Sequence, residues 1–160
     1  IQEGIVPVNP YSRPGDKVSK VTAVGVHYVG NPGTTAEQNR SYVNNLAELK
    51  NAYASSQYVV DLQGEIIQCV PLDEIAYASN NRNYDTISIE CCHQDADGRF
   101  TDDTYNSLVR LVAALCRTYG LDPETDVIRH YDVTGKLCPI YYVNNPDEWY
   151  AFKLSVKNEM

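Results

Sequence analysis

Basic residues and long apolar runs are both scarce in this sequence. Its 160 residues include 13 Lys and Arg against 21 Asp and Glu, which gives a net charge of −8. Nucleic-acid binding needs clustered positive charge, so we expect no nucleic-acid partner. No apolar run approaches the roughly 20 residues that span a bilayer, and no basic start followed by an apolar segment marks a signal peptide. We therefore expect a globular monomer without a membrane partner.

Close cysteine pairs, internal repeats and low-complexity tracts are also missing. The five cysteines form no CxxC pair of the kind that structural zinc sites use. Four of them lie in apolar strand or helix patterns, where we expect buried free thiols: Cys69, Cys91, Cys92 and Cys116. Cys138 differs because it lies in a polar loop. A chain of this length without linkers is typical of one domain.

Strand and helix patterns alternate along the chain. We expect strands at residues 21–28, 86–92 and 126–130, and a hairpin that turns at residues 62–64. Helices are expected to begin at Thr35, with a capping box to Gln38, at Thr101, and near residue 144. The first 19 residues are predicted to be an arm that packs through Ile5, Val6 and Val8. The pattern predicts an α/β domain whose mixed central sheet has helices on both faces.

Two of the three histidines and one cysteine fall where ligands gather in an open α/β sheet, at strand ends. His27 is near the end of the first predicted strand, His130 ends the last one, and Cys138 follows in RHYDVTGKLCP. Two imidazoles and a thiolate are a reasonable ligand set for Zn²⁺ that leaves a fourth position open. A soft thiolate disfavours Mg²⁺ and Ca²⁺. The alternative is that both histidines are hydrogen-bonded core residues.

A single carboxylate interrupts the apolar run TISIECC. Burial of Glu90 is costly unless a cation compensates it. A neighbouring metal ion would do so, and a raised pKa would suit a general base. The alternative is a buried ion pair with one of three arginines: Arg82, Arg99 or Arg129.

Three further polar features lie near these residues. Lys136 could supply positive charge to a developing oxyanion, although a loop lysine is commonly just solvated. His93 is predicted to be a surface or turn residue. The Asn-rich loop at residues 80–84, with Asn81 and Asn83, could hold sugar or peptide groups, and such loops are also common as plain turns.

Four stretches in order resemble the zinc-dependent N-acetylmuramoyl-L-alanine amidases, whose fold is shared with phage lysozyme-type amidases and peptidoglycan recognition proteins. They are HYVGNPG, SSQYVVDLQG, NYDTISIE and RHYDVTGKLCP, and the likeness runs from about Ser12 to Trp149. The set is specific, although each piece alone is weak. The resemblance implies a peptidoglycan-recognition-protein-like amidase fold. It also leads us to expect that residues 1–160 are a single catalytic domain excised from a longer protein with a wall-binding domain.

The resemblance also implies a role for each candidate residue. His27, His130 and Cys138 would bind zinc, Glu90 would be the catalytic carboxylate, and Lys136 would lie beside the scissile carbonyl. The bond hydrolysed would join N-acetylmuramic acid to L-alanine in bacterial peptidoglycan. The protein would act on the cell wall as an autolysin or endolysin, either secreted or made in the cytoplasm and released as a phage lysin.

The sequence departs from the family pattern at three positions. Ser56 stands where some phage members have a catalytic tyrosine, and Gln57 stands where many bacterial members have histidine. Relatives with a glutamate at the position of Glu90 do not need that tyrosine. Tyr77 replaces a further histidine, which puts the substrate contacts expected from Tyr77, Asn81 and Asn83 in question.

Three rival interpretations remain open from the sequence. A non-catalytic module could bind peptidoglycan without cutting it, although such relatives typically lack the cysteine ligand that Cys138 provides. A Cys–His hydrolase could use Cys138 as nucleophile and His130 as base. A structural zinc domain would need a fourth protein ligand such as His93 or Cys92.

Overall fold

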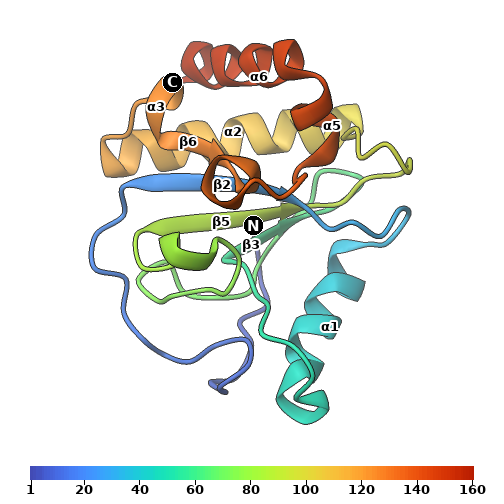
Figure 1. Cartoon of the computed structure of the whole chain (residues 1–160), viewed down its shortest axis with the longest axis vertical. Helices are drawn as coiled ribbons and strands as arrows, with labels where there is room; N and C mark the ends of the chain where they lie inside the picture. Colours follow the sequence, from blue (N-terminus) through green and yellow to red (C-terminus); the bar gives the residue numbers. More distant parts are fainter.

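A six-stranded sheet forms the centre of the computed structural model, which describes residues 1–160 (Figure 1). The strand order is β1-β4-β3-β5-β2-β6. The strands are β1 (Gln2–Glu3), β2 (Ala23–Tyr28), β3 (Tyr58–Val60), β4 (Ile66–Gln68), β5 (Thr86–Cys91) and β6 (Val127–Arg129). Only the β3–β4 hairpin is antiparallel. The expectation of a mixed central sheet is therefore confirmed.

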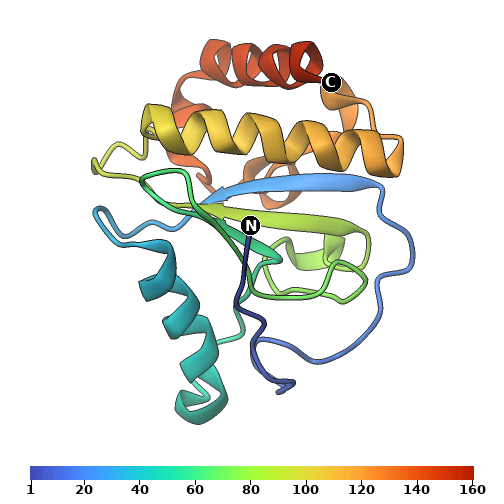
Figure 2. The same ribbon diagram turned by 180° about the vertical axis from the view of Figure 1, so that it is seen from behind.

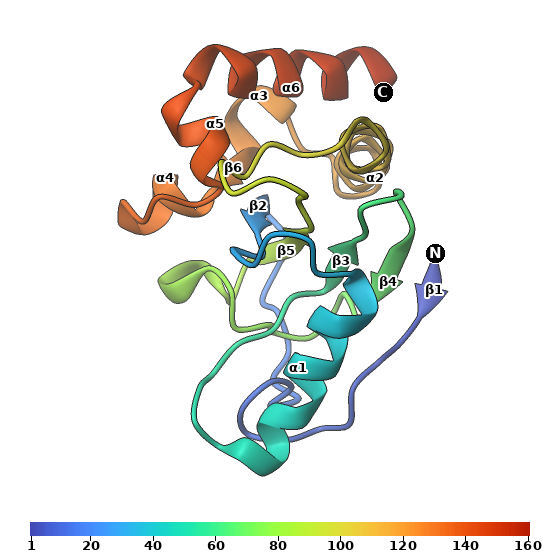
Figure 3. The ribbon, with the colours of Figure 1, turned by 90° about the vertical axis from the view of Figure 1, so that its right-hand side faces the viewer.

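Helices cover both faces of this sheet, as the sequence predicts. The longer helices are α1 (Ala36–Leu49), α2 (Asp102–Tyr119) and α6 (Pro146–Glu159). The short ones are η1 (Asn80–Arg82), α3 (Pro123–Asp126), α4 (His130–Thr134) and α5 (Ile140–Asn144). Helix α2 lies along one face with α6 packed beyond it, and α1 lies on the other side (Figures 2 and 3). None of the helices combines the length and apolar character needed to cross a membrane.

The two central strands present different side chains to the two faces of the sheet. Val24 and Val26 of β2, with Ile87 and Ile89 of β5, enter the main core beneath α2 and α6. Side chains alternate along a strand, so the intervening positions of β2 and β5 face the α1 side. Those positions include Gly25, His27, Ser88 and Glu90. The sheet therefore collects its polar groups on the face that carries the candidate site.

Local capping signals fix both long predicted helices. Thr35 and Gln38 form the expected capping box before α1. The hydroxyl of Thr101 accepts a hydrogen bond from the Thr104 backbone N–H, and α2 ends at Gly120, whose φ of 66° suits glycine. The last predicted helix, beginning near residue 144, is confirmed as α6, whereas the short α5 before it is not predicted, and α3 and α4 shorten the predicted strand at 126–130 to β6.

The N-terminal arm packs less uniformly than expected. Val6 is fully buried, but Val8 is 61% exposed, so its predicted packing is wrong. Arg13 anchors the arm through a bidentate ion pair with Glu74, at 2.9 and 2.8 Å. The same guanidinium donates a hydrogen bond to the carbonyl oxygen of Val6. The arm is thus held by one residue that satisfies both a buried carboxylate and a backbone group.

All five cysteines are free and buried. This confirms the expectation for the four in strand and helix patterns. Cys138 is also buried, at 3% exposure, despite its polar surroundings in sequence.

Candidate metal centre and active site

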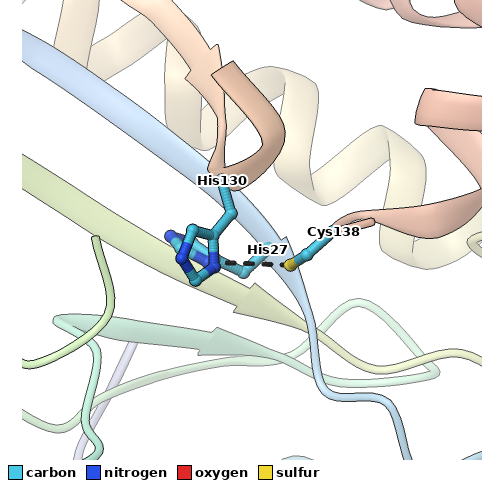
Figure 4. A group of neighbouring side chains, drawn as sticks. All are labelled: His27, His130 and Cys138. Atoms are coloured by element: carbon cyan, nitrogen blue, oxygen red, sulfur yellow. Dashed lines mark hydrogen bonds between the residues drawn. The ribbon is translucent and has the colours of Figure 1, made fainter. Parts of the chain in front are cut away.

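Three side chains of the metal-ligand type converge at the carboxyl ends of β2 and β6 (Figure 4). His27 comes from β2, His130 begins α4 directly after β6, and Cys138 follows in the next loop. One ligand atom from each lies within 4.8 Å of the other two. Cys138 Sγ is 3.8 Å from His27 Nδ1, and the two imidazole centroids are 4.8 Å apart. The structure therefore brings together the three residues that the sequence singles out.

The Nε2 atom of each imidazole lies within hydrogen-bond distance of a side-chain oxygen. His27 Nε2 lies 3.2 Å from Ser79 Oγ, and His130 Nε2 lies 2.7 Å from Asn80 Oδ1. When Nε2 donates to these oxygens, the lone pair of each ring is on Nδ1. Outer hydrogen bonds of this kind orient the histidines of metal sites. The arrangement leaves Nδ1 of each histidine available for a cation.

Gly25 makes room for this outer contact. A Cβ atom at Gly25 would lie 3.1 Å from Ser79 Oγ and 3.3 Å from His27 Nε2. Ser79 Oγ is itself 3.0 Å from Ser88 Oγ, which belongs to the neighbouring strand β5. A side chain at Gly25 would press on the hydroxyl that holds His27 in place.

Burial determines the protonation of the three groups. It lowers the pKa of His27 to about 3, with further lowering from His130 and Lys136. Burial also lowers the pKa of His130. Burial raises the pKa of Cys138 to about 12, and the nearby Glu90 adds to this. At neutral pH both imidazoles are therefore neutral, the form that binds metal, whereas the thiol must lose a proton to become a ligand.

Glu90 lies beside this group without a compensating partner. It is directly opposite His27 in the parallel β2–β5 pairing, so both side chains share one face. Its Oε2 atom is buried and accepts no hydrogen bond. Burial raises the pKa of Glu90 to about 8, and Lys136 counteracts this only in part.

The arginines named as possible partners of Glu90 do not pair with it. Arg82 pairs with Asp85 and Arg129 with Asp132, each at 2.9 Å, and Arg99 forms no ion pair. The alternative of a buried ion pair is therefore contradicted.

A cleft of about 520 Å³ opens onto these groups. It is lined by the three ligand-type residues and Glu90, and Lys136 reaches it from an exposed loop position. Of the three substrate contacts expected from sequence, Tyr77 and Asn83 line the cleft. Asn81 is exposed and does not line it, whereas its neighbour Asn80, which belongs to the same predicted loop, does.

Asn83 serves the fold as well as the cleft. Its side-chain oxygen accepts hydrogen bonds from the backbone N–H groups of Ala78 and Ser79, at 3.2 and 2.7 Å. These bonds fix the turn that carries Ser79 toward His27. The Asn-rich loop is thus both a turn and part of the cleft wall.

His93 is not the surface residue predicted from the sequence, although it also lies outside the ligand group. The residue is 1% exposed, and both of its nitrogens are used. Nδ1 is 2.8 Å from the carbonyl oxygen of Asp95, and Nε2 accepts from the backbone N–H of Gly30 at 3.1 Å. His93 therefore fastens the β2–α1 loop beside the cleft and does not join the ligand group. A histidine between a strand and an acidic turn carries no sequence signal for such a long-range contact.

Cys92 does not provide a fourth ligand either. It packs in the smaller core cluster under α1, and its sulfur accepts from Asn39 Nδ2 at 3.8 Å. The ligand-type group consists of His27, His130 and Cys138 alone.

Three ligand-type side chains beside an uncompensated carboxylate, in a cleft at strand ends, form a candidate hydrolase site that could hold a metal ion. The sequence profile of the N-acetylmuramoyl-L-alanine amidases matches residues 17–140. The chain belongs to this family. This confirms the resemblance found in the sequence.

Relatives and solved structures agree with this assignment. The amidase BlyA of Bacillus subtilis (strain 168) is 36% identical over 97% of the chain, which spans 46% of BlyA. The structure of PlyL matches with a TM-score of 0.82 and 27% identity, covering 100% of this chain and 98% of that one. The catalytic domain of XlyA matches with a TM-score of 0.81 and 26% identity, covering 97% of both chains. The chain therefore spans nearly the whole length of the catalytic domain of XlyA and about half the length of BlyA.

Proposed function

We propose that this chain is a zinc-dependent amidase domain that hydrolyses the bond between N-acetylmuramic acid and L-alanine in peptidoglycan. His27 and His130 would hold the ion through imidazole nitrogen, and Cys138 through its thiolate. The donor set fits zinc, because soft sulfur with two neutral imidazoles leaves an open coordination position and disfavours Mg²⁺ and Ca²⁺. Bound zinc supplies Lewis acidity, which polarises a carbonyl and makes water more acidic.

One observation carries the proposal beyond metal binding. Glu90 has a buried oxygen without a hydrogen-bond partner, in register with His27. A carboxylate left in this state costs stability, and nothing in the core uses it. It is positioned for a proton-transfer role at the edge of the cleft. A binding module would have no need of this group.

Glu90 and Lys136 have separate roles in the proposed reaction. Glu90 accepts a proton from the water that attacks the lactyl carbonyl carbon. It returns that proton to the alanine nitrogen as the carbon–nitrogen bond breaks. Lys136 places positive charge near the oxygen on which negative charge develops. The products are a lactyl carboxylate and a free L-alanine amine.

A Cys–His hydrolase is less well supported by the same geometry. The pKa of Cys138 is raised to about 12, whereas a nucleophilic cysteine needs a lowered one. His27 and Glu90 would also have no task in that mechanism.

Mass spectrometry of digested peptidoglycan tests the proposal. We expect free L-alanine amino termini on the released peptides and intact glycan strands, with no product in the presence of a chelator and recovery on addition of zinc. Glu90→Gln should form product at about a hundredth of the native rate or less while it retains zinc. Cleavage at another bond, or cleavage that survives complete metal removal, would contradict the proposal. The assignment of residues 1–160 to a longer protein with a wall-binding domain stays a prediction.

A further inference from the structure

Three tyrosines from distant parts of the chain form a wall beside the candidate active site. The Tyr11 and Tyr53 rings stack with centroids 5.1 Å apart and an interplanar angle of 21°. Tyr77 meets Tyr53 edge to face, at 5.8 Å and 78°. Tyr53 and Tyr77 line the same cleft as Glu90. We call these three residues the tyrosine wall.

Backbone hydrogen bonds hold the tyrosine wall in place. The N–H of Ala54 donates to the carbonyl oxygen of Tyr11, and the N–H of Ser55 donates to that of Tyr77, both at 3.1 Å. Ser55 Oγ in turn accepts from the N–H of Tyr77 at 2.8 Å. The three segments are therefore tied together before any ligand arrives. Such preorganisation reduces the entropy that binding costs.

The wall presents aromatic surface that the fold does not use. Tyr53 is 65% exposed although Tyr11 is stacked on one of its faces, so most of its remaining surface is open to solvent. Tyr11 and Tyr77 are half-buried. An exposed aromatic surface at the edge of a cleft is typical of a contact site.

We propose that the tyrosine wall binds the apolar face of an N-acetylhexosamine ring in the glycan strand of the substrate. The inference rests on the proposed function, because it names the part of peptidoglycan that this side of the cleft receives. The C–H bonds on one face of a pyranose ring are weakly electropositive and complement the negative face of an aromatic ring. A flat, rigid aromatic surface matches a ring better than it matches a flexible peptide.

The charge around the wall favours a neutral ligand. The pKa of Tyr77 is raised by burial and by the nearby carboxylate of Asp16. An acidic stem peptide would be repelled there, whereas an N-acetylhexosamine whose lactyl group is in amide linkage carries no charge.

A separate hollow beside the cleft can receive the peptide part of the substrate. This smaller hollow of about 160 Å³ adjoins the cleft at Glu90 and runs along α1. Its lining includes the exposed amide of Asn31 and the side chains of Tyr42 and Val43 on α1. The Asn31 amide can pair with the backbone groups of an extended peptide, and the α1 side chains can pack against it. Sugar at the wall and peptide along α1 would place the amide bond between them, next to Glu90.

Kinetics on two soluble substrates test the role of Tyr53. One substrate is a disaccharide muramoyl peptide, and the other is an N-lactoyl peptide that keeps the scissile amide but has no sugar. We expect Tyr53→Ala to lose about fivefold more kcat/KM on the first than on the second, as befits an aromatic contact. Tyr53→Trp should keep kcat/KM on the first within about twofold. Tyr150→Ala, which removes a tyrosine 62% exposed on α6, is the matched control and should change neither.

Equal losses on the two substrates would overturn the proposal, because they would indicate a structural role. A loss that grows with peptide length instead of with the sugar would assign the wall to the peptide and overturn it as well. Thermal melts of each variant separate misfolding from lost contact.

A binding experiment separates this inference from the proposed function. The peptide-free disaccharide of N-acetylglucosamine and N-acetylmuramic acid is titrated into the full chain, and ring signals of Tyr53 are followed by NMR. Saturable shifts that Tyr53→Ala abolishes would support the wall even if the chain cleaved no substrate. Absence of any shift at saturating disaccharide, in a chain that cleaves peptidoglycan, would refute the wall and leave the proposed function standing.

Discussion

Replacement of Glu90 by glutamine should raise the free energy of unfolding of the metal-free protein. In the zinc-loaded protein the same replacement should remove most of the activity. Burial raises the pKa of Glu90 from its ordinary 4.5 to about 8. Between these values the folded chain holds a proton that the unfolded chain has lost, so stability falls as the pH rises toward 8. The slope is about 1.4 kcal/mol per pH unit, which limits the total to about 5 kcal/mol. Glutamine does not ionise, so the free energy of unfolding of the variant does not fall over this pH range for this reason.

Urea unfolding with chelator and reductant, at several pH values from 5 to 8, measures this difference. The stability gained by Glu90→Gln over the native chain should be small near pH 5 and should grow to a few kcal/mol at pH 8. With zinc present, the same variant should lose about a hundredfold or more in kcat, as expected for the loss of a general base. A stability difference that does not change with pH would refute the reasoning, because it would mean that Glu90 is ionised and paired throughout this range.

Four further predictions concern the site and its support. Cys138→Ala should reduce bound zinc to a trace by elemental analysis, and native metal content would contradict the ligand set. Zinc binding at pH 7 should release about two protons, one from that thiol and most of one from Glu90, because both imidazoles are already neutral and the metal-free Glu90 is largely protonated below its pKa of about 8; release of less than one proton, measured by calorimetry in buffers of different ionisation enthalpy, would contradict this. His93→Leu should leave the Gly30 N–H unpaired and lower the free energy of unfolding by about 1–3 kcal/mol, and an unchanged urea midpoint would argue against that bond. Arg13→Gln should cost about 3 kcal/mol by the same measurement, because Glu74 stays buried without its partner, and a loss below about 1 kcal/mol would mean that the pair is not needed.

Local signals account for the parts of the fold that the sequence predicts. Thr35 with Gln38, Thr101 with Thr104, and Gly120 with Cys116 set helix ends through contacts within about one turn. The apolar run around Glu90 marks a central strand because both faces of a covered sheet are buried. Short helices such as α5 lack these signals, so the sequence does not predict them.

The candidate site likewise contains residues that the sequence predicts and supporting residues that it does not. His27, Glu90 and Cys138 are conspicuous because polar or reactive side chains are unusual in their sequence surroundings. The supporting contacts are not conspicuous, because they join residues far apart in the chain. His93 reaches Gly30 across 63 positions and Asn80 reaches His130 across 50. Only the folded chain shows which ordinary histidine or asparagine completes the site.

X-ray absorption at the zinc edge tests the central claim most directly. The native chain, loaded with one equivalent of zinc, should show two imidazole nitrogens, one sulfur and a single light atom that exchanges with added anions. Cys138→Ala should remove the sulfur signal. A second sulfur or a third imidazole in the native spectrum would fill the open position with protein and contradict a catalytic site built from His27, His130 and Cys138.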